Sequence, residues 1–415
     1  MNLIELKQEV EKYQYLEDTN IIDVALASIV ATRLKLGDPI WLVIIGASSG
    51  GKSQILRPLS LTDDKFLHRI DDLTENTFLS GMNVGKGKGD PSLLMRIGNL
   101  GMLVMSDLTV LFSKTSESRN AILSQFRMIY DGEMVKYSGT SDKSIKWKGY
   151  LGVLAGSTPS IYSHFEEVSD MGERFIYYRM KDYDPEKATR LAMSRKIYGK
   201  ELDDKLSNLY GDYIKEVVTA YGGEEIVLPQ NISDRILQIA MFAEKVRTVA
   251  HTDFYKTIDR IPVSAMPMRV ALQLITIAKG LYIMRNGDLS DKDMEIIDWC
   301  GYSLANEEKR ACLKVLGGVE YNKYVSTQNI ADKIGLATSV VGLLLQNLGA
   351  TGILTRTGGN DGLMWTIKHE SHWKIVRRVE KIDIIEEIEE RRITQGEDLK
   401  QLADENFDKI DWEQK

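Results

Sequence analysis

The stretch WLVIIGASSGGKS, residues Trp41 to Ser53, joins a short apolar run to a glycine-rich segment that ends in Lys-Ser. The apolar run is too short to cross a membrane and is typical of a buried parallel strand. Gly46, Gly51, Lys52 and Ser53 follow it at the spacing G-x-x-x-x-G-K-S/T of a phosphate-binding loop, or P-loop. The stretch therefore predicts a strand, a P-loop and the start of a helix.

The chemistry of nucleoside triphosphates explains this spacing. Residues without bulky side chains let backbone N–H groups wrap a phosphate chain, and the following helix adds its positive N-terminal end. Lys52 is then expected to reach the β- and γ-phosphates of ATP or GTP, and Ser53 to hold Mg²⁺. A Gly/Ser loop that carries Lys-Ser by chance is the alternative. The residues expected to contact nucleotide are Gly46, Ala47, Ser48, Ser49, Gly50, Gly51, Lys52, Ser53 and Gln54.

The composition is that of an ordinary globular chain with two or three domains. The 415 residues are 43% hydrophobic and 27% charged. The start of the chain is charged where a signal peptide is apolar, and no run approaches the roughly 18 apolar residues of a membrane helix, so we expect a cytoplasmic protein without membrane contact. The two cysteines, Cys300 and Cys312, provide neither a disulfide framework nor a zinc ribbon. A net charge of −7 means that any DNA contact must be local.

The chain around the P-loop alternates predicted helices and strands. Two helices are expected within residues 1–36, and a short strand over 66–70. The next segment, DDLTENTFLSGM, has helix-start character at Thr74. A glycine–lysine loop, NVGKGKGD, covers 83–90 and is either a flexible tip or a phosphate contact through Lys86 and Lys88.

Three further apolar strands place polar residues where a P-loop ATPase keeps its reactive groups. The segment GMLVMSD ends in Asp107, which is expected to organise Mg²⁺ or to activate water. The segment YLGVLAGSTP carries Thr158, which can sense the γ-phosphate or hold the attacking water. Arg174 precedes the last strand, where it either pairs locally or stabilises phosphoryl-transfer charge in a neighbouring subunit.

A β-hairpin is expected over residues 133–147, after a helix over 117–130. Lysines gather in it, and two interpretations remain open: a solvated edge that lysines protect from aggregation, or a contact with phosphates. These lysines are Lys136, Lys143, Lys146 and Lys148.

The C-terminal half predicts a helical domain and then a small mixed unit. Residues 184–316 show helical patterns without strands, which suggests an all-helical lid. Residues 325–367 have the layout of a winged helix-turn-helix, whose second helix can enter a major groove. That helix has no Lys or Arg, so protein docking is an equal alternative. The expected domains are 1–183, an α/β P-loop core with N-terminal helices; 184–318, the lid; 319–370, the winged helix; and 371–415, a charged tail.

In this order the features resemble the AAA+ ATPase core of the minichromosome maintenance (MCM) helicases and the MCM-like ATPases of phages and mobile elements. The resemblance covers 21–316 and continues into the winged helix. GSTP is similar to the family's sensor 1 motif, GERF to its arginine-finger motif, and Pro-Met-Arg to the opening of its sensor 2 helix. These motifs nominate Thr158, Arg174 and Arg269. LTENTFLSGM with its loop, and the hairpin, match two elements that line the DNA channel in that family, which implies DNA contacts by Lys86, Lys88, Lys143 and Lys146.

The sequence departs from the family pattern in two places. MCM proteins end the Walker B strand in two adjacent acids, whereas Asp107 stands alone here, and Asp131 or Glu133 is a candidate for the second. Few residues precede the P-loop and none is Cys, so the family's zinc-bearing N-terminal domain is not expected.

The resemblance implies an ATP-dependent, ring-forming DNA translocase or helicase, expected as a hexamer, that moves on or unwinds DNA during replication of a phage or mobile element. Lys52, Ser53 and Asp107 would bind ATP and Mg²⁺ from one subunit, and Arg174 and Arg269 would reach in from the next. Single-stranded or forked DNA and replication proteins are the implied partners. The alternatives are an ATP-switched DNA-binding initiator, regulator or helicase loader without unwinding activity, and an ATPase that remodels another protein.

Overall fold

The computed structural model describes residues 1–48, 50–62, 65–80, 92–137, 144–164, 174–181, 184–194, 196–250, 258, 260, 266–359 and 362–382. The chain forms two compact units. The first unit contains Met1–Val249 with Ser264–Asn306, and the second contains Ala250–Val263 with Glu307–Lys415. The boundary expected at residue 184 lies inside the first unit.

A parallel sheet of five strands in the order β2-β3-β6-β1-β7 forms the centre of the first unit. Trp41 on β1 pairs with Val153 on one side, and Leu42 pairs with Ile176 on the other. All of β1 is buried, which explains why its sequence is continuously apolar instead of alternating. These strands confirm the five predicted ones: β1 (Trp41–Ile45), β2 (Leu67–Ile70), β3 (Leu100–Met105), β6 (Tyr150–Ser157) and β7 (Ile176–Arg179).

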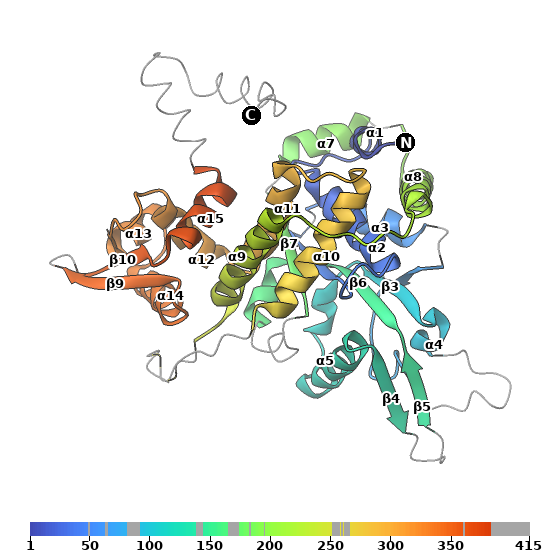
Figure 1. Cartoon of the computed structure of the whole chain (residues 1–415), viewed down its shortest axis with the longest axis horizontal. Coiled ribbons are helices and arrows are strands. Elements are labelled where there is room, and N and C mark those ends of the chain that lie inside the picture. The colour runs from blue at the N-terminus through green and yellow to red at the C-terminus, as the bar shows by residue number, and fades with distance from the viewer. Residues whose placement is uncertain are drawn as a thin grey trace. The chain divides into compact units, whose positions relative to one another are not determined.

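Helices cover this sheet, as Figure 1 shows. Helix α2 is buried along nearly its whole length because α10 packs against it. At the crossing, a Cβ on Gly280 would lie 2.4 Å from the Ala27 carbonyl oxygen, so only glycine permits this approach. The helices of the first unit are α1 (Leu3–Glu11), α2 (Asn20–Arg33), α3 (Lys52–Ser60), α4 (Leu93–Ile97), α5 (Ser116–Tyr130), α7 (Pro185–Ser194), α8 (Gly199–Ala220), α9 (Gln230–Arg247), α10 (Met268–Met284) and α11 (Asp291–Tyr302), with short 3₁₀ helices η1 (Leu108–Leu111) and η2 (Pro159–His164).

The helix predicted to begin at Thr74 is not formed within the described part of that segment. Residues 75–77 form a turn instead. The Thr77 amide donates to the Thr74 carbonyl, and the Thr77 hydroxyl accepts from the Thr74 amide at 2.8 Å. A threonine side chain that bonds to nearby backbone competes with helix formation, which accounts for the wrong prediction.

The predicted hairpin is confirmed as an antiparallel pair, β4 (Glu133–Tyr137) and β5 (Ser144–Lys148). It projects from the sheet in Figure 1. Its base is anchored, because the Trp147 indole donates to the Gly98 carbonyl at 2.6 Å and the Gly149 amide donates to the Gly132 carbonyl at 3.0 Å. Residues 138–143 lie outside the described part of the hairpin.

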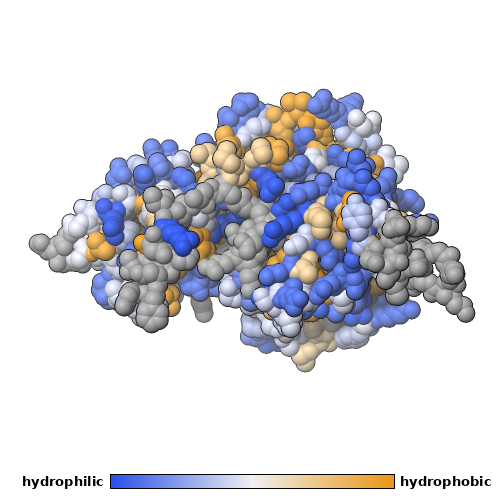
Figure 2. All heavy atoms as spheres, turned by 90° about the horizontal axis from the view of Figure 1, so that it is seen from below, coloured by the Kyte–Doolittle hydropathy of each residue, from blue (hydrophilic) through white to orange (hydrophobic). Residues whose placement is uncertain are grey.

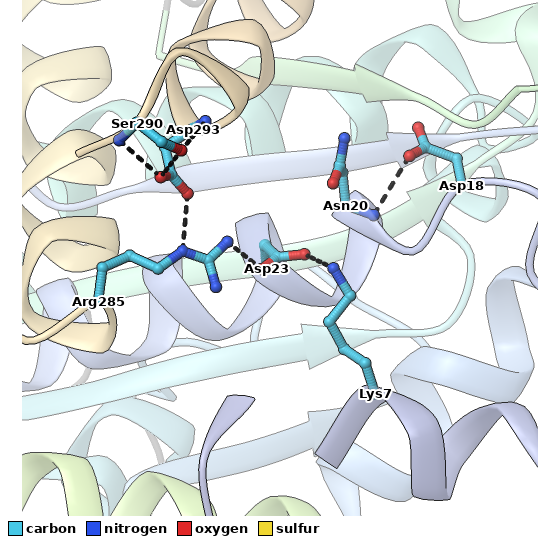
Figure 3. A network of polar contacts seen from close by, with 7 residues as sticks. All are labelled: Lys7, Asp18, Asn20, Asp23, Arg285, Ser290 and Asp293. Carbon is cyan, nitrogen blue, oxygen red and sulfur yellow. Dashed lines mark hydrogen bonds and ion pairs between the residues drawn. The ribbon is translucent and has the colours of Figure 1, made fainter. Parts of the chain in front are cut away.

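A buried network of charges joins four helical segments of the first unit. The Asp23 carboxylate on α2 is completely buried and accepts from Lys7 Nζ at 2.5 Å and from Arg285 Nη2 at 2.7 Å. Arg285, at the end of α10, also donates through Nε to Asp293 Oδ1 at 2.8 Å. Figure 3 shows Asp23 between its two cationic partners, which come from α1 and from the end of α10. The network therefore connects the N-terminal helices with α10 and α11.

The second unit combines helices with a three-stranded antiparallel sheet in the order β8-β10-β9. Trp365 fills its core, with 1% of its surface exposed, and donates through Nε1 to the Thr327 hydroxyl at 3.0 Å. The helices and strands predicted over 327–367 are confirmed. The elements are α12 (Glu307–Gly317), β8 (Val325–Ser326), α13 (Thr327–Ile334), α14 (Thr338–Ala350), β9 (Leu354–Gly359), β10 (Gly362–Ile367) and α15 (Glu370–Glu380).

Within the described ranges, no single helix has both the length and the apolar composition to cross a membrane. The short helices α13 and α14 satisfy that test only when taken together, across a bend of 114°. On the face that Figure 2 presents, hydrophilic residues predominate and apolar ones form separate patches.

Candidate nucleotide-binding site

The P-loop lies at the carboxyl edge of the sheet, between β1 and α3. Gly51 caps α3 with a φ of +86°, a left-handed conformation that favours glycine. The loop is tight, since a Cβ added to Gly50 would lie 3.0 Å from the Ala47 carbonyl oxygen. A turn of small residues that leads into the N-terminus of a helix is an arrangement that binds anions. Ser49, which was also expected to contact nucleotide, lies outside the described residues.

Lys52 directs its ammonium into this loop. Its Nζ donates to the Gly46 carbonyl at 2.8 Å and to the Ala47 carbonyl at 2.6 Å. Burial lowers the pKa of Lys52, and the Asp107 carboxylate partly offsets that effect. The fold thus brings Lys52 and Asp107 into electrostatic contact, although they are far apart in the sequence.

Asp107 and Thr158 follow neighbouring strands and lie at the same edge as the P-loop. Asp107 is exposed, and its Oδ1 accepts from the amide of Thr109 at 2.8 Å and from the hydroxyl of Thr109 at 2.6 Å. The Thr158 hydroxyl contacts that of Ser160 at 2.7 Å. Strands β3 and β6 lie so close together here that a Cβ on Gly156 would be 2.5 Å from the Ser106 carbonyl oxygen. The three expected groups are therefore assembled at one edge.

The residues expected to hold Mg²⁺ suit an ion that arrives with nucleotide. In the described part of the chain, no three His, Cys, Asp or Glu side chains gather in a way that could hold a metal ion. Mg²⁺ commonly uses one or two protein oxygens together with water and substrate phosphates. Ser53, at the exposed start of α3, and Asp107 provide such a partial set, which fits Mg²⁺ bound together with ATP.

A pocket of about 350 Å³ lies beside the P-loop, and no sequence motif predicts it. The helical pattern predicts Tyr13 as an apolar position of the first helix, but α1 ends at Glu11 and the tyrosine lies beyond it. Tyr13 is held by Lys205 Nζ, which contacts its hydroxyl at 2.5 Å and lies 4.6 Å from the ring centroid. No local sequence signal links the lining residues, which are Tyr13, Tyr15, Gly50, Gly51 and Gln54 with Pro185, Ala188, Thr189, Leu191, Ala192 and Met193 of α7.

Two carboxylates that follow the strand paired with β3 were not among the predicted site residues. Asp71 and Asp72 directly follow β2, which pairs with β3, so they lie at the same edge one strand further along. Asp72 forms an ion pair with Lys114 at 2.8 Å, and this hydrogen bond lowers the pKa of Asp72. The Asp-Asp pair after a predicted strand was the available signal.

The two expected arginines lie at the opposite, amino edge of the sheet. Arg174 precedes β7. The ring centroid of the neighbouring Phe175 lies 5.2 Å from that of Trp41, the first residue of β1. Only 6% of the Arg174 surface is exposed, and its guanidinium lies 5.3 Å from the centre of the Tyr130 ring. Burial, and after it the Asp38 charge, raises the pKa of Tyr130, and the charges of Arg269 and Arg174 partly offset this. The fold therefore brings the two arginines together, away from the P-loop of the same chain.

The candidates for a second Walker B acid are also at this amino edge. Asp131 binds Arg174, and Glu133 forms an ion pair with Lys146 at 2.7 Å. Neither carboxylate is close to Asp107, which follows the carboxyl end of β3, so this expectation is wrong for a site within one chain. The reason is that α5 carries the chain back across the sheet before residue 131.

Of the four lysines expected to contact DNA, the structure describes one. Lys146 is exposed on β5, and its hydrogen bond with Glu133 raises its pKa. Lys86, Lys88 and Lys143 lie outside the described residues.

No protein-family model matches this chain, and neither does any curated protein. The class that fold and site define is an α/β protein with a parallel five-stranded sheet.

Proposed function

We propose that this protein is an ATPase that works as a ring of identical subunits and moves on, or unwinds, DNA. The observation that carries the proposal is the division of the expected reactive groups between two edges of one sheet. Lys52, Asp107 and Thr158 lie at the carboxyl edge, whereas Arg174 and Arg269 lie at the amino edge. One chain therefore holds two halves of a site that cannot meet within it.

The carboxyl edge has the groups that an ATP site needs. Backbone amides at the start of α3 and the Lys52 ammonium would bind the phosphates, and Ser53 and Asp107 would hold Mg²⁺. Bound Mg²⁺ would neutralise charge on the phosphates. Asp107 and Thr158 would orient the attacking water, and their positions at strand ends suit this role.

The amino edge would complete the site of a neighbouring subunit. Arginine stabilises the charge that develops in phosphoryl transfer, and such a residue is often supplied by another chain. Because Arg174 and Arg269 are on the wrong edge to serve their own P-loop, the arrangement favours head-to-tail association. Repeated head-to-tail contacts close into a ring when the rotation between subunits permits. This agrees with the resemblance to AAA+ ATPases of the MCM type, for which a hexamer is expected.

The pocket beside the P-loop is suited to the base of the nucleotide. Tyr13 and Tyr15 offer aromatic surfaces at its wall, and α7 contributes apolar ones. Replacing Tyr13 by alanine is expected to raise the KM for ATP by about 10-fold with little change in kcat, because base stacking contributes about 1–3 kcal/mol. Steady-state ATPase kinetics test this expectation. Tyr13→Phe is the matched control, since it keeps the ring and loses only the hydrogen bond between the hydroxyl and Lys205. A KM that alanine leaves unchanged would mean that the base lies elsewhere.

The hairpin and the second unit suggest how DNA and partners are engaged. The hairpin projects from the sheet and carries Lys146 on an exposed position. The second unit has the element order of a winged helix. Its helix α14 lacks Lys and Arg, and exposes Val340, while the preceding Leu336 is also exposed. These apolar side chains favour a protein partner for this helix over a DNA groove.

Strand displacement with DNA-stimulated ATP turnover tests the helicase proposal. On a forked duplex, we expect DNA to stimulate hydrolysis and the duplex to be unwound. The double variant Lys143→Ala/Lys146→Ala should keep ATP turnover without DNA and lose unwinding, because it removes two phosphate contacts. The proposal is contradicted if the protein binds ATP but hydrolyses little of it, displaces no strand, and binds one duplex sequence tightly. That outcome would identify an ATP-switched initiator or regulator.

A further inference from the structure

Arg174 is hydrogen-bonded to Asp131, which lies just before the first strand of the hairpin. Its Nη2 donates to both carboxylate oxygens of Asp131, each at 2.9 Å. Asp131 is the C-cap that follows α5, and Gly132, with a φ of +84°, turns the chain directly into β4. The contact thus lies at the joint between a helix that packs on the sheet and a hairpin that projects from it.

The two partners differ in exposure. Arg174 is buried to 94%, since 6% of its side chain is exposed, whereas 56% of the Asp131 side chain is exposed. A charge-assisted hydrogen bond to a buried guanidinium is strong and directional. The adjacent Tyr130 ring further restricts the orientations that the guanidinium can adopt. The orientation of the Arg174 side chain therefore depends on the position of the Asp131 carboxylate.

Movement of the hairpin should also move this joint, because the base of the hairpin is tightly packed. Trp147 is 4% exposed, and a Cβ on Gly149 would lie 2.4 Å from its ring. The Gly149 amide bonds to the Gly132 carbonyl, so β5 is held to the residue next to Asp131. Lys136 on β4 donates to the Asn76 side chain at 2.8 Å and to the Leu79 carbonyl at 2.9 Å. A displacement of the two strands must therefore act on the Asp131–Gly132 joint.

We propose that Asp131 is a positioning residue that couples the hairpin to Arg174. When DNA displaces the hairpin, the Asp131 carboxylate moves with its base and changes the direction in which Arg174 is held. Coupling of this kind is reciprocal for binding, so a change at Arg174 also reaches the hairpin. The inference rests on the proposed function in assigning DNA to the hairpin and the neighbour's ATP to Arg174. The mechanical connection stands on the contacts alone.

The first test is hydrogen exchange on the full chain, without nucleotide or DNA. In Arg174→Lys and in Asp131→Asn, the backbone amides of β4 and β5 are expected to exchange at least about 10-fold faster than in the wild type, while those of β1 and α10 remain unchanged. Glu117→Gln is the matched control, an acid-to-amide change at the exposed start of the same helix α5. Unchanged exchange in the hairpin of both variants overturns the coupling, whatever the protein does with ATP.

The second test compares ATP turnover with and without DNA. For Asp131→Asn, the ratio of the two rates is expected to fall to within about twofold of one, with the KM for ATP unchanged, because Asp131 lies away from the P-loop. Asp131→Glu should restore part of the ratio. A ratio equal to that of the wild type overturns the proposal, including the case in which both rates fall together. A wild type that hydrolyses no ATP contradicts the proposed function instead, and hydrogen exchange then decides the coupling.

Discussion

Replacement of Lys52 by alanine is expected to lower ATP turnover by about 100-fold or more, because a preorganised charge next to the transferred phosphoryl group is lost. Lys52 Nζ now bonds to two carbonyls of the loop, and β- and γ-phosphate oxygens would become its acceptors. Binding of a fluorescent ATP analogue measures the loss of nucleotide affinity, and release of phosphate measures the loss of turnover. Lys200→Ala, an exposed position at the start of α8, is the matched control.

Mixing two inactive variants makes this test specific for a site shared between subunits. Lys52→Ala keeps Arg174, and Arg174→Ala keeps Lys52, so one kind of interface in a mixed ring is intact. Random mixing in equal amounts leaves about one quarter of the interfaces intact, and turnover should reappear in the mixture. If each variant is inactive alone and the mixture is inactive as well, Lys52 and Arg174 do not meet across an interface. Full turnover by Lys52→Ala alone would remove the P-loop assignment itself.

Replacement of Asp23 by alanine is expected to destabilise the first unit by about 3–5 kcal/mol. Removing one member of a buried ion pair leaves its partner with an uncompensated charge. Here the loss affects both Lys7 and Arg285, whose side chains are only 18% and 26% exposed. Denaturant unfolding followed by circular dichroism measures the change in the free energy of unfolding.

The matched control for Asp23 is Asp212→Ala on α8, where the side chain is exposed. It should change stability by less than about 0.5 kcal/mol. A double-mutant cycle with Arg285→Ala then measures the interaction of Asp23 with Arg285, and a coupling of about 0.5–3 kcal/mol is expected. If Asp23→Ala unfolds at the wild-type denaturant concentration, the network of Figure 3 contributes no net stability.

The strands could be predicted from the sequence because a parallel sheet covered on both faces produces continuous apolar runs. The run from Trp41 to Ile45 and the later runs at β3 and β6 are of this kind. The turn at Thr74 could not be predicted in the same way. There, a side chain–backbone hydrogen bond outweighs a pattern that favours a helix.

The candidate site was predictable where one motif contains it and not where the fold assembles it. The P-loop is local, so spacing alone indicated Gly46 through Ser53. The pocket wall combines Tyr13 with α7, segments that are distant in sequence, and no pattern in either one marks it. Arg174 was identified as a motif residue, but its bond to Asp131 depends on the path of α5 across the sheet.

The pairing of β1 has a consequence for how the protein is made. Its partners, Val153 and Ile176, come more than 100 residues later in the chain. A ribosome therefore releases the most apolar strand of the sheet long before either neighbour exists, and α10, which covers α2, emerges later still. Non-local pairing is slow, and unpaired apolar strands associate with one another. Nascent chains that stop before residue 179 are thus expected to aggregate, and a chaperone that shields β1 until β6 and β7 arrive is expected to raise the yield of folded protein.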